Sequence, residues 1–383
     1  EASGSLANLL TPELMQEMDI SEQARRLSFR GKILIHQGLL RSAEATLQDS
    51  IMAYQQAIGV GADDLILEQV SARIYLARVQ GRRGRLEEAL ELTQDCRQQL
   101  LELSQEEGPP ALELADASEL EGWILVQQGR YREALEACGR ASEGLDHIWE
   151  RDAEADVETE QSLSLLTRAA ALSGLGQHEE AIRLGEQAVE IEKRRAQEGY
   201  EQARMWQAIH RLALAKLFRQ GNLPEKALRV ASDGWSDLDS LPVNQKNHLG
   251  LHMAALHLEI ALANIQLQQW SQVRLPLEQA CSIYENEMWQ SKEYLIAVLL
   301  DCHRHWLDFC RQAANQDWQD RSCWKQFFEG WNRWQAHMHE EVDNVFLHQS
   351  QARLREWTLS LPLSVQQEWN AMAPQGLRVE SAA

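Results

Sequence analysis

Apolar residues recur along most of the chain at spacings of three and four, which is typical of amphipathic helices. The segment 181–191 shows this spacing clearly, and good helix formers such as Leu, Ala, Glu, Gln and Arg are abundant throughout. Glycine or proline interrupts the pattern at short intervals, as at 59–61, 108–110 and 241–242. We therefore predict an all-α protein whose helices are separated by short breaks.

A longer regularity is superimposed on the helical one. A turn and a few polar residues are followed by a small apolar residue that opens a helix, and this unit recurs every 45 to 47 residues. The small residues are Ala43, Ala89, Ala134, Ala181 and Ala227, with Val273 in a weaker sixth copy. A glycine precedes each alanine and suits a helix end that needs a left-handed residue: Gly38, Gly84, Gly129, Gly176 and Gly221. The period predicts a stack of helix pairs in which each pair contacts its neighbours.

This pattern resembles the tetratricopeptide repeat, which pairs a helix A carrying a small residue with a helix B that has an early alanine. The small helix A residue is glycine or alanine in the six copies: Gly31, Ala77, Gly122, Ala169, Ala215 and Ala261. The familiar period is about 34 residues, so the longer period here is more similar to kinesin light chains and MalT-like repeat domains. The resemblance implies a right-handed α-solenoid of antiparallel helix pairs with a C-terminal capping helix.

The resemblance also implies a division of the chain. We expect an N-terminal segment with the first helix at 1–23, six repeats at 24–287, a degenerate seventh repeat at 288–337, a capping helix at 338–361 and a tail at 362–383.

In the tetratricopeptide family, helix A lines the groove that holds a partner. Carried over to this chain, the family's groove positions imply a binding set of Arg25, Lys32, His36, Arg78, Arg82, Trp123, Gln127, Lys216 and Arg219. Arg78 and Arg82 are four residues apart and share a helix face, so they are placed to clamp a carboxylate. The alternative is that they pair with neighbours such as Glu68 or Glu87. The first three repeats lack the helix A Asn of the family's chaperone-tail clamp.

Tryptophan is concentrated near the C-terminal end, where eight of the 13 lie between 289 and 369. Trp324, Phe327, Phe328, Trp331 and Trp334 share one face of a helix. One interpretation is that the face is the core of a cap that covers the end of the solenoid. The other is an exposed docking face made of Trp324, Phe328, Trp331 and Trp334.

The formal net charge of −21 disfavours nucleic acid and anionic lipid as partners of the overall surface. No apolar run approaches the roughly 18 residues that a membrane span needs. The six cysteines form no C-x-x-C pair, which favours free thiols in a reducing, cytoplasmic setting. The chain begins at Glu1 without Met, which leaves three alternatives open: an engineered start, a mature form, or one part of a longer polypeptide or complex.

No recognised catalytic or phosphate-binding motif is present. The segment 339–343 is a near match to a helical zinc motif with Asp in the second ligand place, and His303 and His305 are two residues apart, which on a helix turns them away from each other. We therefore expect no catalytic residue, cofactor or metal. The leading hypothesis is a non-catalytic scaffold that holds a protein or an extended peptide, including acidic segments. The alternatives are a ligand-sensing regulatory module and, less favoured, an enzyme subunit with a site in the Trp- and His-rich C-terminal region.

Overall fold

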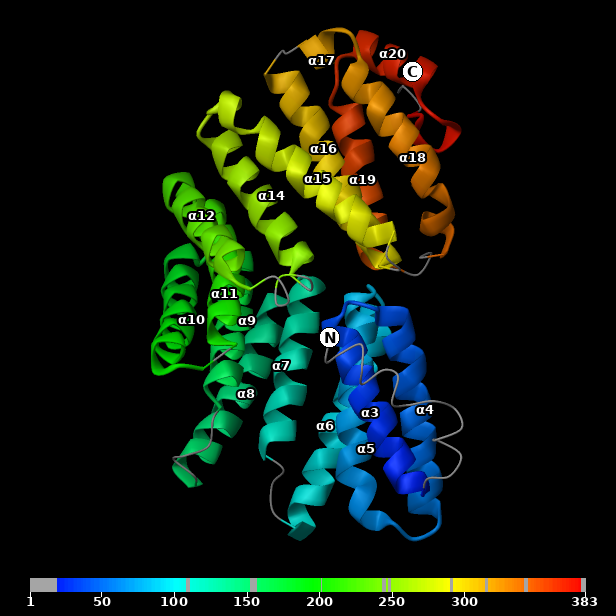
Figure 1. The fold of residues 1–383 in the computed structure, drawn as a ribbon, viewed down its shortest axis with the longest axis vertical. Coiled ribbons are helices and arrows are strands. Elements are labelled where there is room, and N and C mark those ends of the chain that lie inside the picture. The colour runs from blue at the N-terminus through cyan, green and yellow to red at the C-terminus, as the bar shows by residue number, and fades with distance from the viewer. Residues whose placement is uncertain are drawn as a thin grey trace. The chain divides into compact units, whose positions relative to one another are not determined.

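The computed structural model describes residues 19–107, 111–151, 157–200, 202–242, 246, 249–289, 292–313, 316–340 and 344–379. All regular elements within these ranges are helical, which confirms the prediction of an all-α chain (Figure 1). The chain divides into two compact units, Glu1–His248 and Leu249–Ala383, and each is treated by itself. The interruption at 108–110 and the first 18 residues lie outside the described part.

In the described part of unit 1, ten helices form five antiparallel pairs, each made of a helix A followed by a helix B. The pairs are α3 (Ile20–His36) with α4 (Leu40–Gly59), α5 (Ile66–Arg82) with α6 (Leu86–Glu107), α7 (Ala111–Gln127) with α8 (Tyr131–Arg151), α9 (Glu158–Gly174) with α10 (His178–Glu198), and α11 (Ala203–Gln220) with α12 (Pro224–Ser240). A short 3-10 turn, η1 (Asp63–Leu65), precedes α5. Each helix packs against the next in the chain, and each helix A also contacts the helix A of the next pair. This neighbour-to-neighbour packing is that of a solenoid.

The turn inside each pair follows one rule. The residue five positions before the small helix B residue has a positive φ: Gly38, Gly84, Gly129 and Gly176 at 73° to 80°. The following N–H then bonds a carbonyl five residues back, as from Leu39 N to Leu34 O at 2.9 Å. In the fifth pair the loop has the same length, but its glycine stands one position earlier, and Asn222 rather than Gly221 takes the left-handed conformation, with φ of 57°. The prediction that Gly221 takes the left-handed conformation was therefore wrong. The left-handed residue is the one five positions before Ala227, whether or not it is a glycine.

The small residues predicted from the repeat are buried where helices approach closely. Ala43, Ala89, Ala134, Ala181 and Ala227 are at most 1% exposed. A Cβ added at Gly31 would lie 2.6 Å from Leu47 Cγ, so that crossing admits no side chain. Helices of 17 to 22 residues, roughly 26–33 Å long, account for the long repeat period.

Unit 2 begins with a sixth pair, α14 (Gly250–Gln266) and α15 (Arg274–Trp289), with the 3-10 turn η2 (Trp270–Gln272) between them. The later elements are η3 (Glu293–Leu295), α16 (Ile296–Gln312), α17 (Gln316–Gln319), α18 (Ser322–Glu340), α19 (Val345–Leu359), α20 (Leu363–Met372) and η4 (Gln375–Leu377). Helix α16 packs against α15, α18 and α19. The unit boundary thus separates the sixth repeat from the first five.

The segment expected to be a tail contains α20, which belongs to the core. Trp369 of α20 is fully buried, and its ring lies 5.4 Å from that of Trp324 and 4.7 Å from that of Phe328. Its indole Nε1 donates to the carbonyl of Leu377 at 3.1 Å. The helix forms because this tertiary contact buries a large aromatic side chain, which the weak local pattern does not reveal.

The aromatic face of α18 is core. Trp324 and Trp334 are fully buried, and Trp331 and Phe328 are 5% and 6% exposed. Trp334 Nε1 donates to Glu285 Oε1 at 3.1 Å. An exposed docking face does not form from these four residues, since α20 and neighbouring helices cover them.

Candidate binding surface

All nine residues of the predicted binding set lie on helices A of unit 1. Arg25, Lys32 and His36 lie on α3, Arg78 and Arg82 on α5, Trp123 and Gln127 on α7, and Lys216 and Arg219 on α11. The first three helices A bring most of the set into one region, because α3 contacts α5 and α5 contacts α7. Helix α11 has α9, α10 and α12 as its neighbours. We call the surface formed by α3, α5 and α7 the helix A face.

Two arginines on this face are ion-paired to the next helix A. Arg25 Nε lies 2.9 Å from Glu68 Oε2, and its Nη2 donates to Glu68 Oε1 at 3.1 Å. Arg78 Nη2 lies 2.5 Å from Asp116 Oδ1 and 3.9 Å from Glu119 Oε2. Pairing with neighbours is therefore the state of Arg78, although its partners are on α7 and not the expected Glu68 or Glu87.

Burial and nearby charges shift the pKa values of Arg78 and Glu119. The negative charge of Asp116 raises the pKa of Arg78 in spite of burial. Burial also raises the pKa of Glu119, and the nearby Arg78 charge only partly opposes it. Glu119 additionally accepts a hydrogen bond from Thr167 Oγ1 of α9 at 3.0 Å. A polar chain thus runs across α5, α7 and α9.

The pKa values of Lys32 and His36 are both lowered. Lys32 Nζ lies 4.3 Å from the centre of the Tyr75 ring, and burial lowers the pKa of Lys32. The surrounding protein, followed by the charges of Arg82 and Arg78, lowers the pKa of His36. His36 is consequently neutral near pH 7 and adds no positive charge to the face.

The other predicted residues vary in exposure. Trp123 is half-buried, and its Cζ3 would lie 2.9 Å from a Cβ added at Gly81, so its ring packs closely on α5. Gln127 and Arg219 are half-buried, and Arg82 and Lys216 are exposed.

A cavity of about 360 Å³ opens on the helix A face. It is lined by Arg25, Ser28, Phe29, Lys32, Tyr54, Leu67, Glu68, Ser71 and Glu113. Phe29 is 54% exposed and Leu67 is 37% exposed, so two apolar side chains meet solvent at this cavity. We call this the unit 1 cavity.

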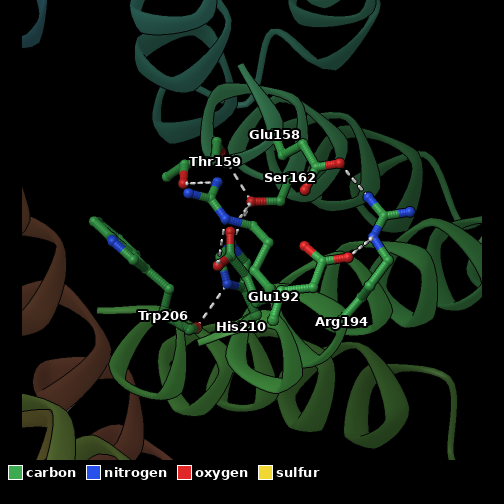
Figure 2. A network of polar contacts seen from close by, with 9 residues as sticks. Glu158, Thr159, Ser162, Glu192, Arg194, Trp206 and His210 are labelled. Atoms are coloured by element: carbon green, nitrogen blue, oxygen red, sulfur yellow. Dashed lines mark hydrogen bonds and ion pairs between the residues drawn. The ribbon is translucent and has the colours of Figure 1, made fainter. Parts of the chain in front are cut away.

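A second polar cluster lies between α9, α10 and α11 (Figure 2). Ser162 Oγ is 3.0 Å from Glu192 Oε1 and 3.2 Å from His210 Nε2. His210 Nδ1 lies 2.6 Å from the carbonyl of Trp206, so Nδ1 carries the hydrogen. Burial lowers the pKa of His210 to about 4, which keeps the ring neutral.

This set contains Ser, His and Glu but differs from a nucleophilic triad. Glu192 bonds to the serine, and the imidazole Nδ1 bonds to a backbone carbonyl rather than to a carboxylate. Ser162, Glu192 and His210 have no exposed surface, so a substrate cannot reach the hydroxyl. The cluster joins three helices.

Two other candidate sites from the sequence were His303 and the segment 339–343. His303 is buried against Trp334, with ring centres 4.7 Å apart, and its Nδ1 bonds the Leu299 carbonyl at 3.0 Å. The near match to a zinc motif at 339–343 lies on residues whose side chains are outside the described part. Among the described residues no three His, Cys, Asp or Glu side chains are grouped to hold a metal. None of the described helices is long and apolar enough to cross a membrane.

The chain matches known proteins in structure but not in sequence. No protein-family model matches the chain, and no curated protein matches it in sequence. The apo form of RapI matches with a TM-score of 0.50 and 11% identity over 92% of this chain and 93% of that chain. A Rap protein complexed with Competence and Sporulation Factor matches with a TM-score of 0.50 and 14% identity over 92% of this chain and 95% of that chain. Both are tetratricopeptide-repeat proteins.

This chain has the tetratricopeptide-type solenoid fold. A STAND signal-transduction ATPase of Pyrococcus horikoshii with a tetratricopeptide repeat sensor also matches, with a TM-score of 0.49 and 11% identity over 96% of this chain and 53% of that chain. The predicted fold class is confirmed by the helical structure and by the likeness to the two Rap structures. At these identities the likeness shows the fold alone.

Within this tetratricopeptide-type solenoid, sequence reasoning missed several residues of the unit 1 cavity. Tyr54 reaches the cavity from helix B α4, where no groove position was expected, and its hydroxyl donates to Glu68 Oε2 at 3.2 Å. Phe29 lies next to the buried Ser28 but is itself exposed. A large aromatic residue outside the buried spacing of its helix was the signal that could have indicated it.

Proposed function

We propose that this protein is a non-catalytic scaffold whose helix A face holds a protein or an extended peptide. The observation that supports the proposal most directly is the unit 1 cavity, at which Phe29 and Leu67 stay exposed. Exposed apolar side chains beside a concave site are the usual anchor points of a partner. The fold adds support, because RapI and related solenoids share it, and one Rap protein was solved with Competence and Sporulation Factor bound.

The charges suggest what kind of peptide fits. The cations Arg25, Lys32, Arg78 and Arg82 are matched by the carboxylates Glu68, Glu113, Asp116 and Glu119 on the same three helices. An acidic segment would have to compete with these carboxylates for the arginines. We therefore favour a peptide anchored by an apolar side chain in the unit 1 cavity, with charged residues of either sign alongside it.

We place this activity in the cytoplasm, since all six cysteines are free thiols. The protein would act as one component of a larger complex or polypeptide.

The experiment is a selection of random peptides on the purified protein, followed by affinity measurements with the best binders. Phe29→Ala should weaken binding by about tenfold or more, because it removes an anchor at the cavity. Met52→Ala is the matched control, since Met52 is 51% exposed but lies on helix B α4 outside the cavity lining. Equal affinity of wild type and Phe29→Ala, or equal losses in both variants, would contradict the proposal.

A further inference from the structure

Unit 2 contains a cavity of about 270 Å³ that the peptide-binding proposal does not use. It lies among α18, α19 and the segment that follows α20. Its polar lining includes Gln335 of α18, Gln351 and Arg355 of α19, and Arg378 near the C-terminal end of the described chain. We call this the unit 2 cavity.

The charged side chains that line the unit 2 cavity are all positive. Arg355 and Arg378 both border the cavity, and no Asp or Glu lines it, although the chain carries a net charge of −21. Within the described residues, Arg355 has no ion pair, and the side chain of Arg378 makes one hydrogen bond, from Nε to the Ala373 carbonyl at 3.0 Å. The other arginines described in unit 2 are each ion-paired to a carboxylate, as Arg353 is to Asp301. Two guanidinium groups without a carboxylate partner among the described residues therefore border the cavity.

A tryptophan ring forms part of the cavity wall. Trp331 lines the cavity, and its side chain is 5% exposed. Its Cζ2 lies 3.8 Å from the place of a Cβ on the cavity residue Gly376. Its Nε1 is buried and has no accessible surface, so the ring offers the cavity an apolar face and not a hydrogen-bond donor.

We propose that the unit 2 cavity binds a small molecule that carries a carboxylate and an apolar group. Arg355 and Arg378 hold the carboxylate, and Leu354 and Leu377 contact its apolar part. The volume equals roughly nine waters at ~30 Å³ each, which is the size of an amino acid rather than of a folded partner. Guanidinium groups suit carboxylates because they present parallel N–H donors.

The test is isothermal titration of the full chain with phenylacetate and isovalerate, each compared with its neutral amide. Both acids are expected to bind, and the amides to bind at least about tenfold more weakly, since they lack the charge. The double variant Arg355→Gln, Arg378→Gln should lose the acids.

Lys325→Gln is the matched control, because Lys325 is an exposed cation on α18 that does not line the cavity. It should bind both acids like the wild type. Circular dichroism checks that each variant keeps its helices. The proposal is overturned if neither acid binds to wild type, if the amides bind as well as the acids, or if Lys325→Gln loses as much affinity as the double arginine variant.

Discussion

Arg78 of α5 donates to Asp116 of α7 at 2.5 Å and so joins two successive helices A. Arg25 of α3 and Glu68 of α5 make the equivalent link one repeat earlier. Each arginine is thereby committed to the next helix A. The ion pairs consequently link successive helices A, and Phe29 and Leu67 remain exposed apolar side chains at the unit 1 cavity.

Arg78→Gln should destabilise unit 1 by about 1–3 kcal/mol, because it leaves Asp116 and Glu119 partly buried without their cation. Urea unfolding followed by circular dichroism measures the change. Arg183→Gln is the control, since the pair of Arg183 with Glu180 lies within α10 and is exposed, and no measurable change is expected there. Similar losses in the two variants would show that the link between helices is not special.

The buried imidazole of His210 predicts an acid sensitivity. Its pKa is lowered to about 4 in the folded protein, whereas an unfolded His titrates near 6.5. As the pH falls through 6.5, the unfolded chain gains a proton that the folded chain does not bind, so folding becomes less favourable. The loss grows until about pH 4 and then stays constant. For a fully buried ring it amounts to roughly 3 kcal/mol.

The measurement is the free energy of unfolding between pH 7 and 4 for wild type and for His210→Asn, which cannot take up the proton. The gap between the two proteins should shift in favour of the variant as the pH falls. A gap that stays constant over this range would mean that His210 binds its proton equally well in the folded and unfolded chains.

Trp369→Ala should destabilise unit 2 by about 3–5 kcal/mol, because it removes a fully buried ring from contact with Trp324 and Phe328. Tryptophan fluorescence during urea unfolding reports on this unit, since eight of the 13 tryptophans lie between 289 and 369. Trp289→Ala is the comparison, as Trp289 is 47% exposed, and it should cost far less. Equal costs would place Trp369 outside the core.

The turn in the fifth repeat shows how far the sequence could have been taken. Counting back five residues from each small helix B residue leads to Gly38, Gly84, Gly129, Gly176, Asn222 and Gln268, and all six have positive φ. Because a glycine stands at 221, the left-handed conformation was predicted there rather than at Asn222. The rule is local, because the helix end and the next helix start lie within a few residues, and Asn tolerates the left-handed conformation.

The candidate site was harder to predict from the sequence than the turns were. The sequence placed the predicted binding set on helices A, but it could not name the partners of Arg25 and Arg78, which are 43 and 38 residues away. It also missed Tyr54 at the unit 1 cavity and the arginines that line the unit 2 cavity. These depend on how neighbouring helices are set against each other.

The sequence by itself determined the helices, the repeat period, the small residues at the helix crossings and the aromatic face of α18. Each of these follows from spacing along the chain, because helix periodicity and turn conformation depend on residues close in sequence. Only the tertiary structure decided which charges are neutralised, which aromatic residues stay exposed and where the cavities lie. Those outcomes are set by packing between helices, where side chains from distant positions compete for the same contacts and for burial.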